Sequence, residues 1–247
     1  MTMKNYIMES LGVFALCYIG GMSILNNTGK EGANVAVAHM LALGIMIYVG
    51  AATSGSHFNP AVSLALLFTK NVGCIDCIFY CLFQFLGGFF GAFLIWGIHA
   101  ESDEAAKLNK ENGEPYCSSY PHIAGKSVTE TGGQYSARVF QACFAEFFAT
   151  FFLVFMVFGT ALDTTSRTSA YGFCIAGAVG MSALGIGSIT GGAMNPMRWL
   201  GPYIVSFWGC TRGNQSGWGF LIYGVFTCLG GVSAGILYKV LFWIPKA

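Results

Sequence analysis

Charged residues are scarce in this sequence: lysine, arginine, aspartate and glutamate together make up 9% of its 247 residues. A soluble domain carries roughly 25%, so the composition excludes a soluble fold and indicates an integral membrane protein. The formal net charge is +1, which gives no reason to expect nucleic acid or an acidic partner. The apolar run from Tyr6 follows only Lys4 and has no convincing cleavage site, so we interpret it as a first span and not as a signal peptide.

Clusters of catalytic or metal-binding side chains are also missing from the apolar stretches. They contain no Ser/His arrangement and no set of metal ligands, so we predict no enzyme, no metal site and no cofactor. Nine cysteines are present, and Cys74, Cys77 and Cys81 follow one apolar helix. A thiol in such a place serves as a small hydrophobic group.

Six apolar windows are long enough to cross the hydrocarbon core, which needs roughly 20 residues. They cover about residues 6–25, 34–53, 74–98, 138–160, 170–189 and 217–243. Two shorter apolar stretches, 59–69 and 195–207, begin with an Asn-Pro pair and are predicted to be half-helices. The hydrophilic segment 100–136 is predicted to be a connecting loop on the outer side of the membrane.

One motif occurs in each half of the chain. Residues 54–61 read S-G-S-H-F-N-P-A, and residues 190–197 read T-G-G-A-M-N-P-M. An acidic residue precedes each Asn-Pro pair by a similar distance, 50 residues for Glu9 and 49 for Glu146. A Leu-Gly-Gly triplet follows each motif.

These matches predict that residues 1–99 and 137–247 are two copies of one design. Each copy holds three spans, and because three is odd, the second copy enters the membrane from the opposite side. Membrane proteins built from inverted repeats place their pathway at the interface between the repeats. A mild excess of lysine and arginine on one side predicts that both termini lie in the cytoplasm.

The two Asn-Pro pairs predict a pore at the middle of the membrane. Irregular backbone at that depth is tolerated only where protein covers it or where it lines a wet cavity. Each half-helix would direct its N-terminus, with roughly half a positive charge, toward the midplane. We expect Asn59 and Asn195 to cap the half-helices through their oxygens and to leave their amide N–H groups free for the lumen. The predicted central constriction comprises Asn59, Pro60, Ala61, Asn195, Pro196 and Met197.

A water held by two such donors turns its own hydrogens away and cannot relay a proton, so this pore would pass neutral molecules and block ions and protons.

Several motifs of the chain resemble those of the major intrinsic proteins, the aquaporins. The similar segments are Ser-Gly-x-His-x-Asn-Pro-Ala-Val at 54–62, Ala-Glu-Phe at 145–147, Gln84 with Leu86-Gly87, and Asn-Pro-x-Arg-x-x-Gly-Pro at 195–202. The resemblance covers essentially the whole chain. It implies an all-α membrane fold, a right-handed bundle of six tilted helices and two half-helices in inverted repeats. It also implies a homotetramer with one pore per subunit.

The resemblance further implies a selectivity filter, whose four positions correspond to His39, Ala183, Gly192 and Arg198. An arginine in an apolar segment is costly unless it faces water or a partner, which favours a lumenal place for Arg198. His39 could instead be a satisfied histidine between helices. The filter resembles that of the vacuolar intrinsic proteins of plants more than that of glycerol facilitators, and Ala183 would leave it wider than in strictly water-selective relatives.

Glu9 and Glu146 bear on the alternatives. Acidic residues inside a membrane suggest a proton relay or an ion site. Their matched placement instead favours a structural role, in which each accepts hydrogen bonds from the unwound loop before a half-helix. The resemblance implies the same role.

The favoured function is a passive channel in a lipid bilayer for water and small neutral solutes: ammonia, urea and hydrogen peroxide, with glycerol at the limit. A secondary transporter shares inverted repeats and broken helices, but it needs a further carboxylate in the lumen. A junctional membrane protein of low conductance is a third possibility, with Met197 and Trp199 narrowing the pore. The host membrane would be the plasma membrane or a vacuolar or other internal membrane.

Overall fold

A computed structural model describes residues 1–26, 32–99, 121, 132–208 and 217–243. The regular secondary structure in these ranges is helical, without strands. Six of the described helical stretches are long and apolar enough to cross a membrane. This agrees with the six predicted spans.

The helices follow one another in the same order, long, long, short and long, in each half of the chain. The first half holds α1 (Met3–Asn26), α2 (Gly32–Ser54), α3 (Pro60–Phe68) and α4 (Cys74–His99). The second half holds α6 (Gly132–Val157) with η2 (Phe158–Leu162), α7 (Tyr171–Thr190), α8 (Pro196–Val205) with η3 (Ser206–Trp208), and η5 (Phe220–Phe226) with α9 (Thr227–Leu241).

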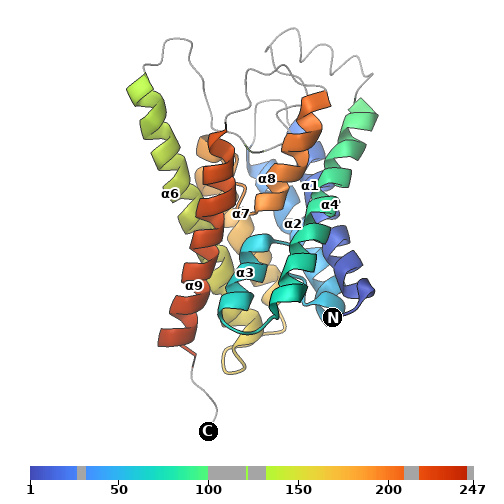
Figure 1. Ribbon diagram of the computed structural model, residues 1–247, viewed down its shortest axis with the longest axis vertical. Helices are drawn as coiled ribbons and strands as arrows, with labels where there is room; N and C mark the ends of the chain where they lie inside the picture. Colours follow the sequence, from blue (N-terminus) through green and yellow to red (C-terminus); the bar gives the residue numbers. More distant parts are fainter. Residues whose placement is uncertain (27–31, 100–120, 122–131, 209–216, 244–247) are drawn as a thin grey trace.

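The two short helices enter the bundle from opposite ends. Figure 1 shows α3 in the lower half, beside α9, and α8 in the upper half, beside α4. The N-terminus and the described C-terminal end of α9 both lie at the lower end, which we call the inner end.

Asparagine and proline begin each short helix for local reasons. Asn59 and Asn195 have extended backbones, with φ of −160° and −153°, and each is followed by a proline in the first turn. Proline fits the first turn of a helix because the N–H it lacks would have no partner within the helix. The prediction of half-helices at 59–69 and 195–207 therefore agrees with α3 and with α8 extended by η3.

The loops before the short helices repeat the same unusual backbone. Positive φ angles occur at matched positions: 84°, 52° and 49° at Gly55, Ser56 and Phe58, and 74°, 57° and 51° at Gly191, Gly192 and Met194. A bulky residue such as Phe58 or Met194 rarely adopts this left-handed conformation. Such strain persists only where surrounding structure imposes it, and it is concentrated at functional sites.

Glycines let each short helix touch a long helix of the other half. A Cβ on Gly88 of α4 would lie 2.5 Å from the carbonyl oxygen of Met197, and a Cβ on Gly231 of α9 would lie 2.9 Å from that of Ala61. Small residues permit this close approach in membrane proteins. The two halves are therefore interlocked through α3 and α8.

One boundary differs from the sequence prediction. The loop was predicted to extend through residue 136, but α6 already begins at Gly132. A polar first turn, Gly-Gly-Gln-Tyr, hides this start because it precedes the apolar run. The rest of the predicted loop lies outside the described residues, apart from Pro121.

Candidate functional site

The side chains of Asn59 and Asn195 hold the two loops together at the centre of the molecule. Asn59 Nδ2 donates to the Met194 carbonyl oxygen at 2.7 Å, and Asn195 Nδ2 donates to the Phe58 carbonyl oxygen at 2.7 Å. Their Oδ1 atoms accept from the first turns of α3 and α8, from Ala61 N and Met197 N, both at 2.9 Å.

This arrangement corrects one expectation. We expected both N–H bonds of each amide to be free for the lumen, whereas one of them donates to the opposite loop. An amide carries two N–H donors, so each asparagine keeps one for the cavity that it lines. Phe58 and Met194, whose carbonyl oxygens accept these hydrogen bonds, are two of the residues with a left-handed backbone.

Glu9 anchors the first loop from α1. Its carboxylate accepts from Ser54 Oγ at 2.6 Å, from the backbone N–H groups of His57 and Phe58 at 3.0 and 2.6 Å, and from Gln84 Nε2 at 2.8 Å. The side chain is fully buried. Buried charge is tolerated when hydrogen bonds satisfy it, and here the bonds also fix the loop.

Glu146 does the same for the second loop from α6. It accepts from Thr190 Oγ1 at 2.6 Å and from the backbone N–H groups of Ala193 and Met194 at 2.8 and 2.7 Å. It is also fully buried. Both carboxylates therefore face loop backbone and hydroxyl donors, and neither lines the cavities described below.

Two tyrosines that were not predicted as site residues complete the support of the loops. Tyr80 donates to the Ser54 carbonyl oxygen at 2.6 Å, and Tyr223 donates to the Thr190 carbonyl oxygen at 2.7 Å. Both are buried. Each lies seven residues before the first glycine of a Leu-Gly-Gly triplet, so an alignment of the two halves from that triplet would have found them.

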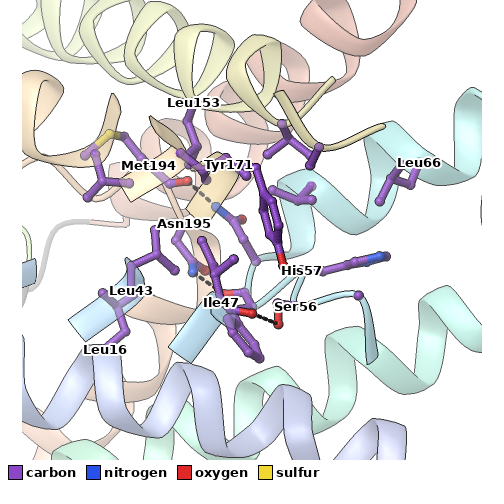
Figure 2. A pocket seen from close by; sticks show the side chains of 18 of the residues that line it. Leu16, Leu43, Ile47, Ser56, His57, Leu66, Leu153, Tyr171, Met194 and Asn195 are labelled. Atoms are coloured by element: carbon purple, nitrogen blue, oxygen red, sulfur yellow. Dashed lines mark hydrogen bonds between the residues drawn. The ribbon is translucent and has the colours of Figure 1, made fainter. Parts of the chain in front are cut away.

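An inner cavity of about 130 Å³ runs from the two asparagines toward the inner end. Figure 2 shows its wall, where Leu16, Leu43 and Leu153 lie near Asn195 and Tyr171. The His57 ring points away from Asn195 in this view, and its Nδ1 lies 3.0 Å from Ser63 Oγ. A mostly apolar wall with a few polar groups lets a small molecule pass without binding tightly.

An outer cavity of about 430 Å³ lies on the opposite side of Arg198, which lines both cavities. One Arg198 guanidinium nitrogen donates to the Gly191 carbonyl oxygen at 2.9 Å and also to that of Gly192. Its Nε is buried and has no hydrogen-bond partner among the described residues. The guanidinium is thus held by the second loop, at the junction of the cavities.

The other predicted filter residues gather around the same junction. His39 and Ala183 line the outer cavity. The His39 ring is tightly held, with Nδ1 2.8 Å from the Val35 carbonyl oxygen and Nε2 against Gly20 of α1. Gly192 contributes its carbonyl oxygen to Arg198, and a Cβ there would lie 3.3 Å from the Cα of Ala183.

Two of the six residues predicted to form the central constriction line the inner cavity, and a lining role for the other four stays a prediction. The described lining of the two cavities includes Asn59 and Asn195 but not Pro60, Ala61, Pro196 or Met197. Ala61 packs against α9, where a Cβ on Gly231 would lie 3.2 Å from the Ala61 Cβ. Met194, one residue before Asn195, also lines the inner cavity.

Trp199 also points away from both cavities. Its ring stacks on Tyr203 and Tyr223, with centroids 4.7 and 5.5 Å away, and only 3% of the residue is exposed. The proposal that Trp199 narrows the pore therefore has no support in the geometry.

Trp199→Ala is expected to lower thermal stability without changing which solutes pass. Removing a buried aromatic side chain costs about 3 kcal/mol, but Arg198 beside it would keep its contacts with the second loop. Thermal unfolding in detergent measures the first effect, and solute uptake by proteoliposomes measures the second. A wider solute range in the variant would contradict the assignment of Trp199 to packing.

Comparison with known proteins assigns the chain to a family. The family model described as Major intrinsic protein matches residues 1–238, so the chain belongs to the major intrinsic protein family. It is a multi-pass integral membrane protein of a family of passive channels for water and small solutes, and it is not an enzyme.

The individual relatives are plant aquaporins. The chain is 32% identical to a protein named probable aquaporin TIP2-2 from Arabidopsis thaliana, over 98% of this chain and 88% of that one. It is 28% identical to aquaporin NIP3-1 of the same plant, over 96% of this chain and 67% of the relative. The X-ray structure of the aquaglyceroporin from Plasmodium falciparum shares the fold, with a TM-score of 0.77, 22% identity and 96% of each chain covered.

Proposed function

We propose that this protein is a passive channel for water that also passes small neutral solutes and excludes ions and protons. The observation that carries the proposal is the position of Arg198, which joins the inner and outer cavities, with the two asparagines at the adjoining end of the inner one. A continuous path through the bundle would cross these three side chains in turn.

The exclusion of protons depends on Asn59 and Asn195. Both side chains are tied to the opposite loop, so the N–H that each retains has a fixed direction toward the cavity. The N-termini of α3 and α8 add a positive partial charge at the same level. A water that accepts from both donors points its hydrogens outward, which interrupts a proton wire and repels a hydrated cation.

The solute range depends on the group around Arg198. We assign the filter to His39, Ala183, Gly192 and Arg198, in which Arg198 and His39 supply polarity and the small side chain of Ala183 supplies width. This combination suits ammonia, urea and hydrogen peroxide, with glycerol at the limit. The name of the Plasmodium falciparum protein refers to glycerol, but that similarity supports only the fold.

The cellular setting follows from the family by analogy. We propose a homotetramer with one pore per subunit and both termini in the cytoplasm, since the described ends lie on one side of the bundle. The similarity to plant aquaporins named TIP favours a vacuolar or other internal membrane over the plasma membrane.

Stopped-flow light scattering on proteoliposomes tests the proposal. Vesicles with the protein are exposed in parallel to gradients of sucrose, glycerol, urea and an ammonium salt, with empty vesicles as the control. In the sucrose gradient we expect rapid shrinkage of the vesicles with a low activation energy. In the urea gradient we expect the vesicles to shrink and then to swell again as urea enters. Shrinkage no faster than that of empty vesicles would refute a water channel.

Ala183→His is expected to reduce urea entry at least about tenfold relative to water entry. The imidazole would occupy the outer cavity beside Arg198 and Gly192, and filling a pocket that a substrate uses has effects of this size. Ala183→Val is the matched control, because it adds bulk without polarity and should slow both water and urea. An unchanged urea-to-water ratio in Ala183→His would remove Ala183 from the filter.

A further inference from the structure

The segment η2 borders the inner end of the pore, and the family assignment does not explain which contacts hold it there. Ala161 and Leu162 of η2 line the inner cavity together with Leu66 of α3 and Tyr171 of α7. The segment η2 is π-helical. A π-turn is rare and often marks a functional position, so we ask which contacts hold Leu162 in its place.

Asp163, the residue after Leu162, is held by a compact set of hydrogen bonds. Its Oδ1 accepts from the backbone N–H and the hydroxyl of Thr165 at 2.9 and 2.7 Å, and its Oδ2 accepts from the Tyr238 hydroxyl of α9 at 3.0 Å. Asp163 is 2% exposed although it lies outside the spans.

The charge of Asp163 strengthens these bonds. The hydroxyl and the backbone N–H of Thr165 lower the pKa of Asp163, so the side chain is a carboxylate at neutral pH. The stability that the Asp163 carboxylate contributes is fully present above the ordinary aspartate pKa. It is lost only as the pH falls through the lowered pKa of the folded state. Hydrogen bonds to an ionised acceptor are stronger than those between neutral groups.

Tyr238 is itself fixed against the segment. It is 7% exposed, and its ring covers Gly159, where an added Cβ would lie 3.2 Å from the ring. Ser166 Oγ lies 3.3 Å from the Tyr238 hydroxyl and donates to the Gly159 carbonyl oxygen at 2.5 Å. Tyr238 therefore contacts Gly159 near the start of η2 and Ser166 in the chain that follows η2.

The next residue of α9 fastens the other side of the same opening. Lys239 Nζ donates to the carbonyl oxygen of Thr69, which follows the last turn of α3. A cation at that end also complements the partial negative charge of a helix C-terminus. Successive residues of α9 thus hold η2 and α3, which contribute Leu162 and Leu66 to the cavity.

We propose that Asp163 and Tyr238 are positioning residues that keep the Phe158–Leu162 segment docked on α9 and so hold the inner mouth of the pore open. When the carboxylate loses the tyrosine, the segment leaves α9 and Leu162 moves toward the apolar cavity that it already borders. Water permeation then slows. This inference rests on the proposed channel function for its transport consequence, but the docking itself does not.

Tyr238→Phe tests the proposal with one atom removed and the ring retained. We expect water permeability per channel to fall about twofold or more, with a higher activation energy, since a hydrogen bond to a charged group is lost. Tyr6→Phe is the matched control, because Tyr6 donates to Asp76 at 2.8 Å and neither residue lines the cavity. A permeability equal to that of Tyr6→Phe, or above it, would overturn the proposal.

Backbone amide exchange separates this inference from the channel function. The N–H groups of Asp163 and Thr168 donate to the Phe158 and Thr160 carbonyl oxygens at 2.9 and 3.1 Å. In Tyr238→Phe their exchange should be about tenfold faster than in Tyr6→Phe. Unchanged exchange would overturn the docking role, whereas a parent protein without water permeability would refute the channel and leave this result to stand alone.

Discussion

Arg198→Ala is expected to make the channel leak monovalent cations and protons, which we propose that the parent protein excludes. A fixed positive charge about 4 Å away opposes a cation by about 4 kcal/mol at an effective dielectric constant of about 20. Arg198 supplies this charge where the two cavities meet. We expect a leak roughly a thousandfold above that of the parent protein, with water permeability kept or increased.

The folded state should survive this change. The Gly191 and Gly192 carbonyls lose the guanidinium, but water can replace it because Arg198 borders both cavities. Arg198→Lys keeps the charge without the planar donor group and serves as the control. It should retain ion exclusion while losing selectivity among neutral solutes. A leak in Arg198→Ala no greater than that of the parent would place the cation barrier elsewhere.

Glu9→Ala and Glu146→Ala are expected to abolish the folded channel. Glu9 accepts four hydrogen bonds and Glu146 three, all from buried or loop groups. Each unpaired buried donor costs about 1–3 kcal/mol. The summed cost approaches the free energy of unfolding of a typical protein, which is about 5–15 kcal/mol. Thermal unfolding and the yield of detergent-soluble protein measure the loss.

Glutamine substitutions distinguish this structural role from proton coupling. Glu9→Gln and Glu146→Gln keep one oxygen acceptor, so they should fold with reduced stability and still conduct water. A proton-coupled transporter would instead keep its fold and lose pH-dependent uptake. Asp76→Ala is a suitable control, because this acid lies at the start of α4 with its side chain 26% exposed and interacts with Tyr6 and the N-terminal amine. Full stability in Glu146→Ala would refute the anchoring role.

The sequence predicted the architecture closely because the membrane restricts it. Length and apolarity determine where a helix can cross, and the spans at 34–53 and 170–189 differ from α2 and α7 by two residues or fewer at each end. The two Asn-Pro pairs located α3 and α8 since both residues have fixed preferences at a helix start.

Side-chain direction within the bundle was harder to predict. In a helix that is apolar on every side, periodicity does not reveal which face meets the lumen. Met197 was therefore assigned to the pore, and Trp199 was considered only as a residue that could narrow it in a low-conductance protein. In the structure α8 turns Trp199 toward Tyr203 and Tyr223. The hydrogen bonds from Asn59 and Asn195 to the opposite loop were not predicted. They form only because two loops that are distant in the sequence meet, with a left-handed backbone at Phe58 and Met194.

Measurement of water flux and proton flux in one preparation of proteoliposomes tests the central claim most directly. Vesicles that contain a pH-sensitive dye are subjected to an osmotic step and, separately, to a potassium diffusion potential that drives protons inward. The pore around Asn59, Asn195 and Arg198 predicts rapid water flow and a proton flux equal to that of empty vesicles. Proton entry that rises with the amount of protein, or water flow that does not, would contradict it.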